Sequence, residues 1–303
     1  MLRTELHCHN VYSNGHVGDL EPPFDCNVSI SEQLEKSLES KLDVLFVTNH
    51  NTLDGFNQIT DYKNDHEKFS NLKIYPAVEI TTDKEAHVLV YGLHEEIKSN
   101  QTLDEIIDAA KSQDAITIAP HPFSLIDALR DDSLKCDLFE VFNSSNIDIY
   151  SNKKAEIFAK EKNLLTTAGS DSHIASTIGR CTNLIDSQNN LDDVIHAMKK
   201  GKISIEKTEY VTHREVLEHI QYKIENSKEY IDKYIQEFYP KYFWLFNQMY
   251  KSYMFTKKSF MWRAVFKIAL FGLRRISYKI NFEGYDPYAF RTRDIPTMTK
   301  MIF

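Results

Sequence analysis

Several features that would place this chain in a familiar class of protein are missing from its sequence. Its four cysteines lie far apart and form no Cys-x-x-Cys pair, so neither a zinc ribbon nor a disulfide framework is predicted. The first residues lack the apolar segment of a signal peptide, and no run of about 18 apolar residues could form a membrane-spanning helix. Neither a Gly-x-Gly-x-x-Gly nor a Gly-Lys-Ser/Thr motif is present, which excludes the usual nucleotide-binding loops. We therefore expect a reduced, cytoplasmic protein.

Size and charge set further bounds. With 303 residues, 42% of them hydrophobic, the chain can bury a substantial core, and we expect one large domain with an appendage. The formal net charge of −8 argues against a general DNA-binding protein. This average hides a contrast, because acidic and basic residues are unevenly distributed along the chain.

Residues 1–207 alternate between short apolar runs and helical patterns. The strand-like runs are 5–9, 42–48, 73–80, 87–91, 115–119, 138–142 and 164–168. Helical patterns occur at 31–40, 103–111, 153–162 and 191–200. Such alternation is typical of a mostly parallel sheet covered by helices, and this number of strands favours a barrel over an open sheet.

Residues that can bind metal ions recur at the ends of these strand-like runs. His7 and His9 are two residues apart on the first run, so both imidazoles point to the same face of a strand. Similar residues end or follow the later runs: Asn49, His50, Glu79, His121, Glu140, Asn143, Asp171 and His173. Any one of these histidines alone would be interpreted as a capping or core residue. Because the C-terminal strand ends of such a barrel converge on one face, the set as a whole predicts a metal site there.

Four motifs, taken together and in this order, carry a resemblance to a known family. They are Leu6-His7-Cys8-His9, Val47-Thr48-Asn49-His50, Val78-Glu79-Ile80-Thr81-Thr82 with His87-Val88-Leu89, and Ala119-Pro120-His121-Pro122 with Gly169-Ser170-Asp171-Ser172-His173. In these motifs the chain resembles the PHP (polymerase and histidinol phosphatase) superfamily of metal-dependent phosphoesterases. The segments Ile178-Gly179-Arg180 and 197–202 are similar to the closing part of that family.

The resemblance implies a distorted (β/α)7 TIM-like barrel that binds two or three divalent metal ions (Zn, Mn or Fe). Carried over by position, the implied ligands form three groups: His7, His9, Glu79 and Asp171 around a first ion; Glu79, His87 and His121 around a second; His50 and His173 around a third. The residue types agree with this assignment, because imidazole binds these metals and a bridging carboxylate can hold two cations close together.

Two positions depart from the family pattern. Asn14 stands where the family has the aspartate of Ser-Asp-Gly, and Asn49 stands where it has the aspartate of Thr-Asp-His. An amide oxygen can coordinate a metal but brings no negative charge, so the third ion is the one most affected. His16 or Asp19 could supply the missing ligand. His94 is a further candidate that competes with His87.

The implied reaction is hydrolysis of a phosphate ester by a metal-activated hydroxide. Glu79, Asp171 and His173 would be catalytic, and Arg180 would either grip a phosphate oxygen or be an ordinary surface arginine. The substrate would be a small phosphomonoester, or a nucleotide or oligonucleotide phosphate. Two alternatives stay open: a phosphoprotein phosphatase, and a catalytically weakened regulatory or binding module.

Residues 208–303 are predicted to form a helical extension of different character. A single long amphipathic helix is expected over 211–238. The stretch Lys241 to Phe282 then contains nine lysines and arginines, about a dozen aromatic residues and no acidic residue. It could be a helical cap on the barrel, a surface that rests on an anionic membrane so that the protein is peripheral to it, or a groove for single-stranded nucleic acid. No protein partner can be inferred.

Overall fold

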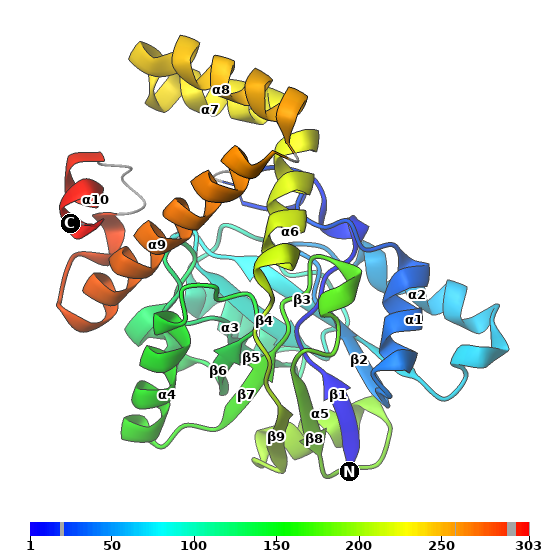
Figure 1. Cartoon of the computed structure of the whole chain (residues 1–303). Coiled ribbons are helices and arrows are strands. Elements are labelled where there is room, and N and C mark those ends of the chain that lie inside the picture. Colours follow the sequence, from blue (N-terminus) through cyan, green and yellow to red (C-terminus); the bar gives the residue numbers. More distant parts are fainter. Residues whose placement is uncertain (19–20, 258, 290–294, 303) are drawn as a thin grey trace.

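The computed structural model describes residues 1–18, 21–257, 259–289 and 295–302, and its centre is a nine-stranded sheet curled into a nearly closed barrel (Figure 1). The strands are β1 (Leu2–Glu5), β2 (Val44–Val47), β3 (Lys73–Thr81), β4 (His87–Tyr91), β5 (Ile116–Ala119), β6 (Leu138–Asn143), β7 (Thr166–Gly169), β8 (Thr182–Ile185) and β9 (Ile203–Lys207). Their order in the sheet is β7-β6-β5-β4-β3-β2-β1-β8-β9. All run in one direction except β4 and β8, which run in the opposite one.

The barrel closes between β7 and β8 through a side chain. Asn183 on β8 is fully buried, accepts a hydrogen bond from the Ala168 amide (3.0 Å) and donates one to the Ala168 carbonyl (2.8 Å). An asparagine can do both because its amide carries a donor and an acceptor. One side chain thus satisfies two backbone groups of β7 that would be costly to bury unpaired.

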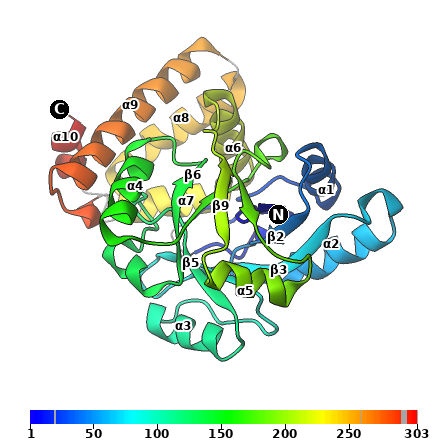
Figure 2. The same cartoon turned by 90° about the horizontal axis from the view of Figure 1, so that it is seen from below.

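Helices cover the barrel on the outside and at one end. They are α1 (Ile30–Glu39), α2 (Asp54–Asn64), α3 (Leu103–Lys111), α4 (Tyr150–Lys162) and α5 (Leu191–Lys199). Figure 2, which views the barrel from below, shows α5 at the end that faces the viewer, where Val194 and Met198 pack on the core. The interior is filled by large residues such as Phe46 and Tyr91, whose hydroxyl donates a hydrogen bond to the Leu6 carbonyl across the barrel (2.7 Å). The core thus lies below the strand ends that carry the histidines.

The structure confirms the predicted α/β barrel with C-terminal helices and adds two features. First, β3 and β4 form an antiparallel hairpin, because the chain between them is too short for the crossover that parallel strands need. Second, β8 and β9 were not predicted as strands. Each is short and pairs with its neighbours in antiparallel fashion, next to the seam that Asn183 closes.

The C-terminal extension consists of α6 (His213–Asn226), α7 (Lys228–Phe238), α8 (Phe243–Thr256), α9 (Phe260–Phe282) and α10 (Ile295–Ile302). The prediction of one helix over 211–238 was wrong, because the chain breaks at Ser227 between α6 and α7. The side chains of Asn226 and Ser227 can compete with the helix for backbone hydrogen-bond partners. Asn226 Nδ2 donates to the Tyr222 carbonyl (2.8 Å). In Figure 1, α7 and α8 lie side by side above the barrel, with α6 and α9 rising toward them.

The second half of α9 is attached to the barrel by specific contacts. Arg274 donates from Nε to the Ile147 carbonyl (3.1 Å), and the Ser277 hydroxyl donates to Asp148 Oδ1 (2.7 Å). Tyr278 packs edge-on against Tyr150 of α4. None of the described helices is both long and apolar enough to cross a lipid bilayer. The division of the chain into 1–207 and 208–303 stays a prediction.

The seam gives a first testable prediction. Asn183→Ala should lower the free energy of unfolding by about 2 to 4 kcal/mol, because it leaves the buried amide and carbonyl of Ala168 without partners. Urea unfolding at a fixed metal concentration measures this change. Asn57→Ala, on the exposed face of α2, is the matched control and should be close to neutral. An equally small effect of Asn183→Ala would mean that other contacts close the barrel.

Candidate metal centre

A first group of donor atoms gathers where β1, β3 and β7 end. His7 Nε2 lies 3.3 Å from Glu79 Oε2 and 3.4 Å from Asp171 Oδ1. His9 Nε2 lies 3.3 Å from each of the same two oxygens. Both histidines are fully buried, and Glu79 is 1% exposed. Two imidazole nitrogens and two carboxylate oxygens therefore lie close together, and they belong to the residues that the family resemblance implies around a first ion.

The opposite nitrogens of these two histidines are held by other groups. His7 Nδ1 pairs with Glu140 Oε1 (3.0 Å), and His9 Nδ1 pairs with the Ser13 hydroxyl (3.1 Å). Glu140 is itself fixed, because its Oε2 accepts hydrogen bonds from the His121 amide and from Asn143 Nδ2 (2.8 Å each). Such partners set the tautomer and ring orientation of a metal-binding histidine. Here they direct both Nε2 atoms toward Glu79 and Asp171.

A second group surrounds the other oxygen of Glu79. Glu79 Oε1 lies 3.0 Å from His121 Nε2 and 3.1 Å from His87 Nδ1. His121 Nδ1 lies 3.3 Å from Asp127 Oδ1, in the loop that follows β5. The Glu79 carboxylate thus stands between two sets of donors, with one oxygen directed to each.

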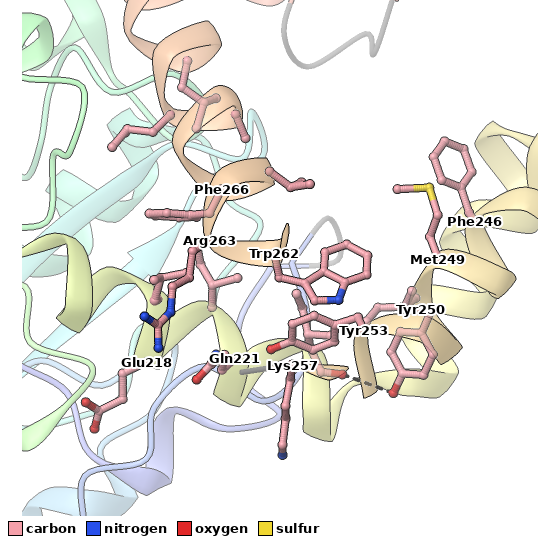
Figure 3. Close-up of a pocket in the computed structure, with 18 of the residues that line it drawn as sticks. Glu218, Gln221, Phe246, Met249, Tyr250, Tyr253, Lys257, Trp262, Arg263 and Phe266 are labelled. Atoms are coloured by element: carbon pink, nitrogen blue, oxygen red, sulfur yellow. Dashed lines mark hydrogen bonds between the residues drawn. The ribbon is translucent and has the colours of Figure 1, made fainter. Parts of the chain in front are cut away.

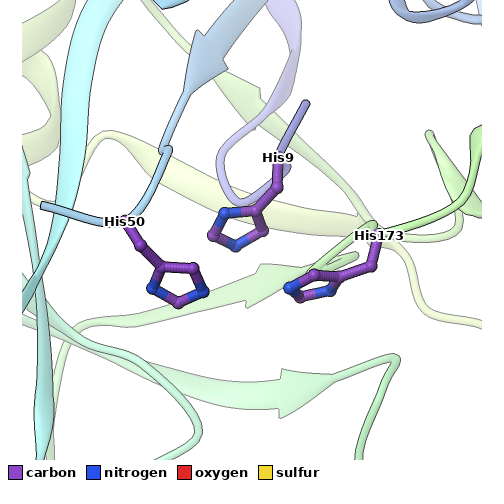
Figure 4. A group of neighbouring side chains, drawn as sticks. All are labelled: His9, His50 and His173. Carbon is purple, nitrogen blue, oxygen red and sulfur yellow. The ribbon is translucent and has the colours of Figure 1, made fainter. Parts of the chain in front are cut away.

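A third group contains His50 and His173. Each ring lies against that of His9, with centroids 4.6 and 4.4 Å away, and the His50 and His173 centroids are 6.1 Å apart, so the three rings form a triangle (Figure 4). Asp25 Oδ2 lies 2.8 Å from His173 Nε2 and 3.4 Å from His50 Nε2. His173 Nδ1 pairs with the Asp171 carbonyl (2.9 Å), which fixes the ring. Asp25 therefore supplies a carboxylate to this group, and the sequence analysis did not single it out.

The two asparagines that depart from the family pattern, Asn14 and Asn49, hold neighbouring segments in place through hydrogen bonds. Asn14 Oδ1 accepts hydrogen bonds from the amides of Asp25 (2.7 Å) and Cys26 (2.9 Å), and so holds the loop that carries Asp25. Asn49 Oδ1 accepts from the Asn10 amide (2.9 Å) and its Nδ2 donates to Asn10 Oδ1 (2.9 Å). Neither amide belongs to the donor groups described above.

The alternative ligands that the structure describes, His16 and His94, and also Arg180, lie outside the pocket over the donor groups. His16 is exposed and does not line the pocket, His94 is exposed on a loop that pairs with Gln113, and Asp19 lies outside the described residues. The guanidinium of Arg180 forms ion pairs with Glu209 and with Glu215 (2.6 Å), and Arg180 is not among the residues that line the pocket. The expectation that Arg180 grips a phosphate is therefore not supported by its position. Its contacts fix the first turn of α6 to the barrel.

Two of the candidate ligands have a strained backbone. His121 has φ 28° and Asp171 has φ 50°, in the left-handed region that non-glycine residues seldom adopt. The Asp171 amide donates to the His7 carbonyl (2.7 Å), and the His121 amide donates to Glu140 (2.8 Å). Strain of this kind costs of order 1–3 kcal/mol per residue and clusters at functional sites.

Unpaired polar atoms show that cations fit this centre. Among the described residues, five of the buried side-chain atoms without a hydrogen-bond partner belong to it: His9 Nε2, Asp25 Oδ2, His50 Nδ1, His87 Nδ1 and His121 Nδ1. Leaving buried polar atoms unpaired is costly. Imidazole nitrogens and carboxylate oxygens that converge in this way are a donor set suited to metal ions.

The charges of these groups depend strongly on one another. Burial alone would raise the pKa of Glu79, but His7, His87 and His50 hold it well below its usual range. Burial would likewise lower the pKa of His173, yet the carboxylates of Asp25 and Asp171 raise it to about 9. The acids are thus ionised in the folded protein. Positive charge from protons or from metal ions has to balance them.

Helix α6 forms one wall of the pocket above these groups, which has a volume of about 360 Å³. His219 Nε2 contacts the Asp25 carbonyl (2.8 Å), and its ring stacks on His173 with centroids 4.7 Å apart. Lys223 donates to Asp25 Oδ1 (2.6 Å), and its side chain is 20% exposed. Among the described residues that line the pocket, Lys223 is the only lysine or arginine. One sequence signal could have found this wall: Glu215, His219 and Lys223 are spaced at i, i+4 and i+8 on one helix face.

Comparison with known proteins agrees with this picture. A family model described as PHP-associated matches residues 150–203. The uncharacterized protein MJ1587 of Methanocaldococcus jannaschii is 31% identical over 152 residues, which cover 48% of this chain and 85% of the relative. The uncharacterized protein MJ0417 of the same organism is 32% identical over 126 residues, covering 38% of this chain and 53% of the relative.

Among solved structures, PsfC from Pseudomonas syringae PB-5123 has a similar fold. The TM-score is 0.51 at 18% sequence identity, and the match covers 74% of this chain and 98% of PsfC. Together with the motifs and the barrel, these matches define the class. The chain belongs to the PHP superfamily, which the PHP-associated family model identifies, and the likeness to PsfC shows the fold alone.

The third group gives a second prediction. If Asp25, His50 and His173 hold an ion, Asp25→Asn should reduce the number of bound metal ions per chain by one, as measured by elemental analysis after dialysis. Asn49→Asp is the comparison variant and should add no bound metal ion. The second carboxylate oxygen of the new aspartate would face Asn10 Oδ1 and not the donor groups. An unchanged ion count in Asp25→Asn would show that this carboxylate is not a ligand.

Proposed function

We propose that this protein is a metal-dependent phosphoesterase that hydrolyses phosphate monoesters. The observation that carries the proposal is the Glu79 carboxylate, which directs one oxygen to each of two groups of histidines at the base of a pocket. A carboxylate in this position can bridge two cations, and Lys223 adds a positive side chain in the pocket wall. A negatively charged phosphate group would be attracted both by such cations and by Lys223.

The residues that would hold cations are those of the three groups. The first group is His7, His9, Glu79 and Asp171, the second is Glu79, His87 and His121, and the third is His50, His173 and Asp25. When bound there, divalent ions would lower the pKa of a water molecule and neutralise phosphate oxygens. The protein holds the donors in place through Glu140, Ser13 and the Asp171 carbonyl, so little reorganisation is needed.

Lys223 is placed to take the phosphate-binding role, which the sequence analysis gave to Arg180 as one of two alternatives. Its ammonium group is fixed by Asp25 at 2.6 Å and lies 3.9 Å from Glu21 Oε2. Burial would lower the pKa of Lys223, but these two carboxylates raise it, so the side chain is charged at neutral pH. A charged lysine at the pocket wall can bind a phosphate oxygen as a compact positive charge.

Two features weigh against the alternatives. A weakened regulatory module was conceivable because Asn14 and Asn49 replace carboxylates, but Asp25 brings a carboxylate to the same histidines. A phosphoprotein phosphatase would need an open site, whereas α6 forms one wall of this pocket and contributes His219 and Lys223 to it. A small phosphate ester therefore fits better than a phosphorylated protein.

The direct test is a panel of phosphate monoesters and diesters offered to the manganese-loaded protein. Glu79→Gln keeps the size of the side chain but removes the charge shared by both groups. Turnover should fall by a factor on the order of 100 or more, with loss of bound metal and an unchanged circular dichroism spectrum. Turnover close to that of the wild type would rule out a bridging role for Glu79.

Lys223 and Arg180 can be separated by a matched pair of variants. Lys223→Gln should raise KM for a phosphate monoester roughly 10- to 100-fold, since it removes a charge-assisted hydrogen bond to the substrate. Arg180→Gln should leave KM unchanged and lower the free energy of unfolding, because it releases Glu209 and Glu215. The reverse result, with KM responding only to Arg180→Gln, would return the phosphate-binding role to the arginine.

A further inference from the structure

Next to the metal centre, the C-terminal helices surround an apolar groove of about 1210 Å³ (Figure 3). Residues from α6, α7, α8 and α9 line it, and it is much larger than the pocket over the metal centre. Ile147 and Ile220 line both hollows. The groove and the pocket are therefore adjacent at these two residues.

The lining of this groove is mainly hydrocarbon. Leu217 and Ile224 contribute from α6, and Phe266 and Leu273 contribute from α9. Some of the lining is open to solvent, since Val265 is 43% exposed. Soluble proteins seldom leave a large apolar surface uncovered unless it binds something.

We propose that the groove holds the hydrocarbon chain of the substrate, so that the substrate is an amphiphilic phosphate monoester. Its phosphate would lie at the metal centre beside Lys223, and its chain would pass Ile147 and Ile220 into the groove. This inference rests on the phosphoesterase function proposed above. It assigns the C-terminal extension a part in choosing the substrate.

A hydrocarbon chain fits the groove better than a strand of nucleic acid. A nucleic acid needs a line of cations for its phosphates. Among the described residues, three arginines and lysines line the groove: Arg214, Lys257 and Arg263. Lys257 is paired with Glu225 at 2.9 Å, and the acidic Glu218 lies on the same side of the groove as Arg263 (Figure 3).

The outer faces of α8 and α9 also suit an amphiphile. Trp244, Phe255 and Phe260 are 73%, 91% and 84% exposed, on a stretch that carries many cations and no acidic residue. Aromatic and basic residues together favour the boundary between water and lipid. The helices that line the groove could therefore receive a chain from a micelle or bilayer.

Chain length provides the first test. Ethyl, hexyl and dodecyl phosphate, each below its micelle-forming concentration, are compared as substrates of the manganese-loaded protein. We expect kcat/KM to rise roughly fourfold for each buried methylene until the groove is filled. Ala269→Trp should abolish the gain for dodecyl phosphate and leave ethyl phosphate unaffected, because this small residue lines the groove. Ile268→Trp is the matched control, since Ile268 is 71% exposed and outside the groove.

A binding test without turnover uses the two tryptophans of the chain. Trp262 lines the groove and Trp244 does not, so Trp244→Phe leaves one reporter in place. Dodecylphosphonate, which has no ester bond to hydrolyse, should shift the emission of Trp262 to shorter wavelength. Ala269→Trp would add a second reporter, so Ala269→Phe is used here to block binding.

The outcomes separate the two proposals. If ethyl phosphate is hydrolysed and kcat/KM does not rise with chain length, the inference about the substrate fails while the phosphoesterase function stands. If no ester is hydrolysed but Trp262 responds to dodecylphosphonate, the phosphoesterase proposal fails and the groove still binds chains. If Trp262 responds only to a single-stranded oligonucleotide, or only to rising protein concentration, the groove has another occupant and the inference is overturned.

Discussion

The burial of one carboxylate, that of Glu79, is the constraint on which the rest of the site depends. An ionised carboxylate with 1% exposure is costly unless positive or proton-donating groups surround it. Here five histidines meet this requirement: His7, His9, His50, His87 and His121. These histidines come from separate strands and loops, so the closed barrel is what brings them to one side chain. Burying Glu79 without cations would be unfavourable, and each of its two oxygens faces a separate group of histidines, so Glu79 is able to hold two cations.

The third group shows how a lost charge can be replaced from a different part of the chain. The two positions where the family pattern has aspartates are occupied by amides, yet His50 and His173 still face a carboxylate, from Asp25. One of the two amides, Asn14, binds the backbone of Asp25 and so helps to position it. An aspartate at position 14 could not keep all of these contacts, because Asn14 also donates from Nδ2 to the Cys26 carbonyl (2.9 Å). Asn14 therefore brings no charge to the third group, but it helps to position Asp25, whose carboxylate does.

Features of the fold and the site that depend on neighbouring residues in the sequence could be predicted, whereas those that depend on contacts between distant residues could not. Strand ends such as His7-Cys8-His9 were found because alternation along a strand dictates which side chains share a face. Asp25 and Asp127 are on loops, where no periodicity tells which way a side chain points, and their roles follow only from contacts with distant residues. Arg180 was given a phosphate-binding role from its place beside a motif, but ion pairs to Glu209 and Glu215, 29 and 35 residues further on, direct it elsewhere. The barrel class needed only the alternation of strands and helices, whereas the antiparallel β8 and β9 had no pattern long enough to recognise.

The C-terminal extension packs on the barrel and also leaves apolar surface exposed. Part of its positive charge is used for packing, since Arg274 binds the Ile147 carbonyl and Lys257 pairs with Glu225. The same helices leave large aromatic residues such as Phe255 and Phe260 exposed on their other faces. A cap that only covered the barrel would turn such side chains inward, because each buried ring is stabilising. Since α6 also brings Lys223 and His219 to the pocket, the extension meets the barrel at its site and not on a remote surface. Because Ile220 of α6 lines both the pocket and the apolar groove, a change in this helix acts on both hollows without altering the donor groups of the barrel.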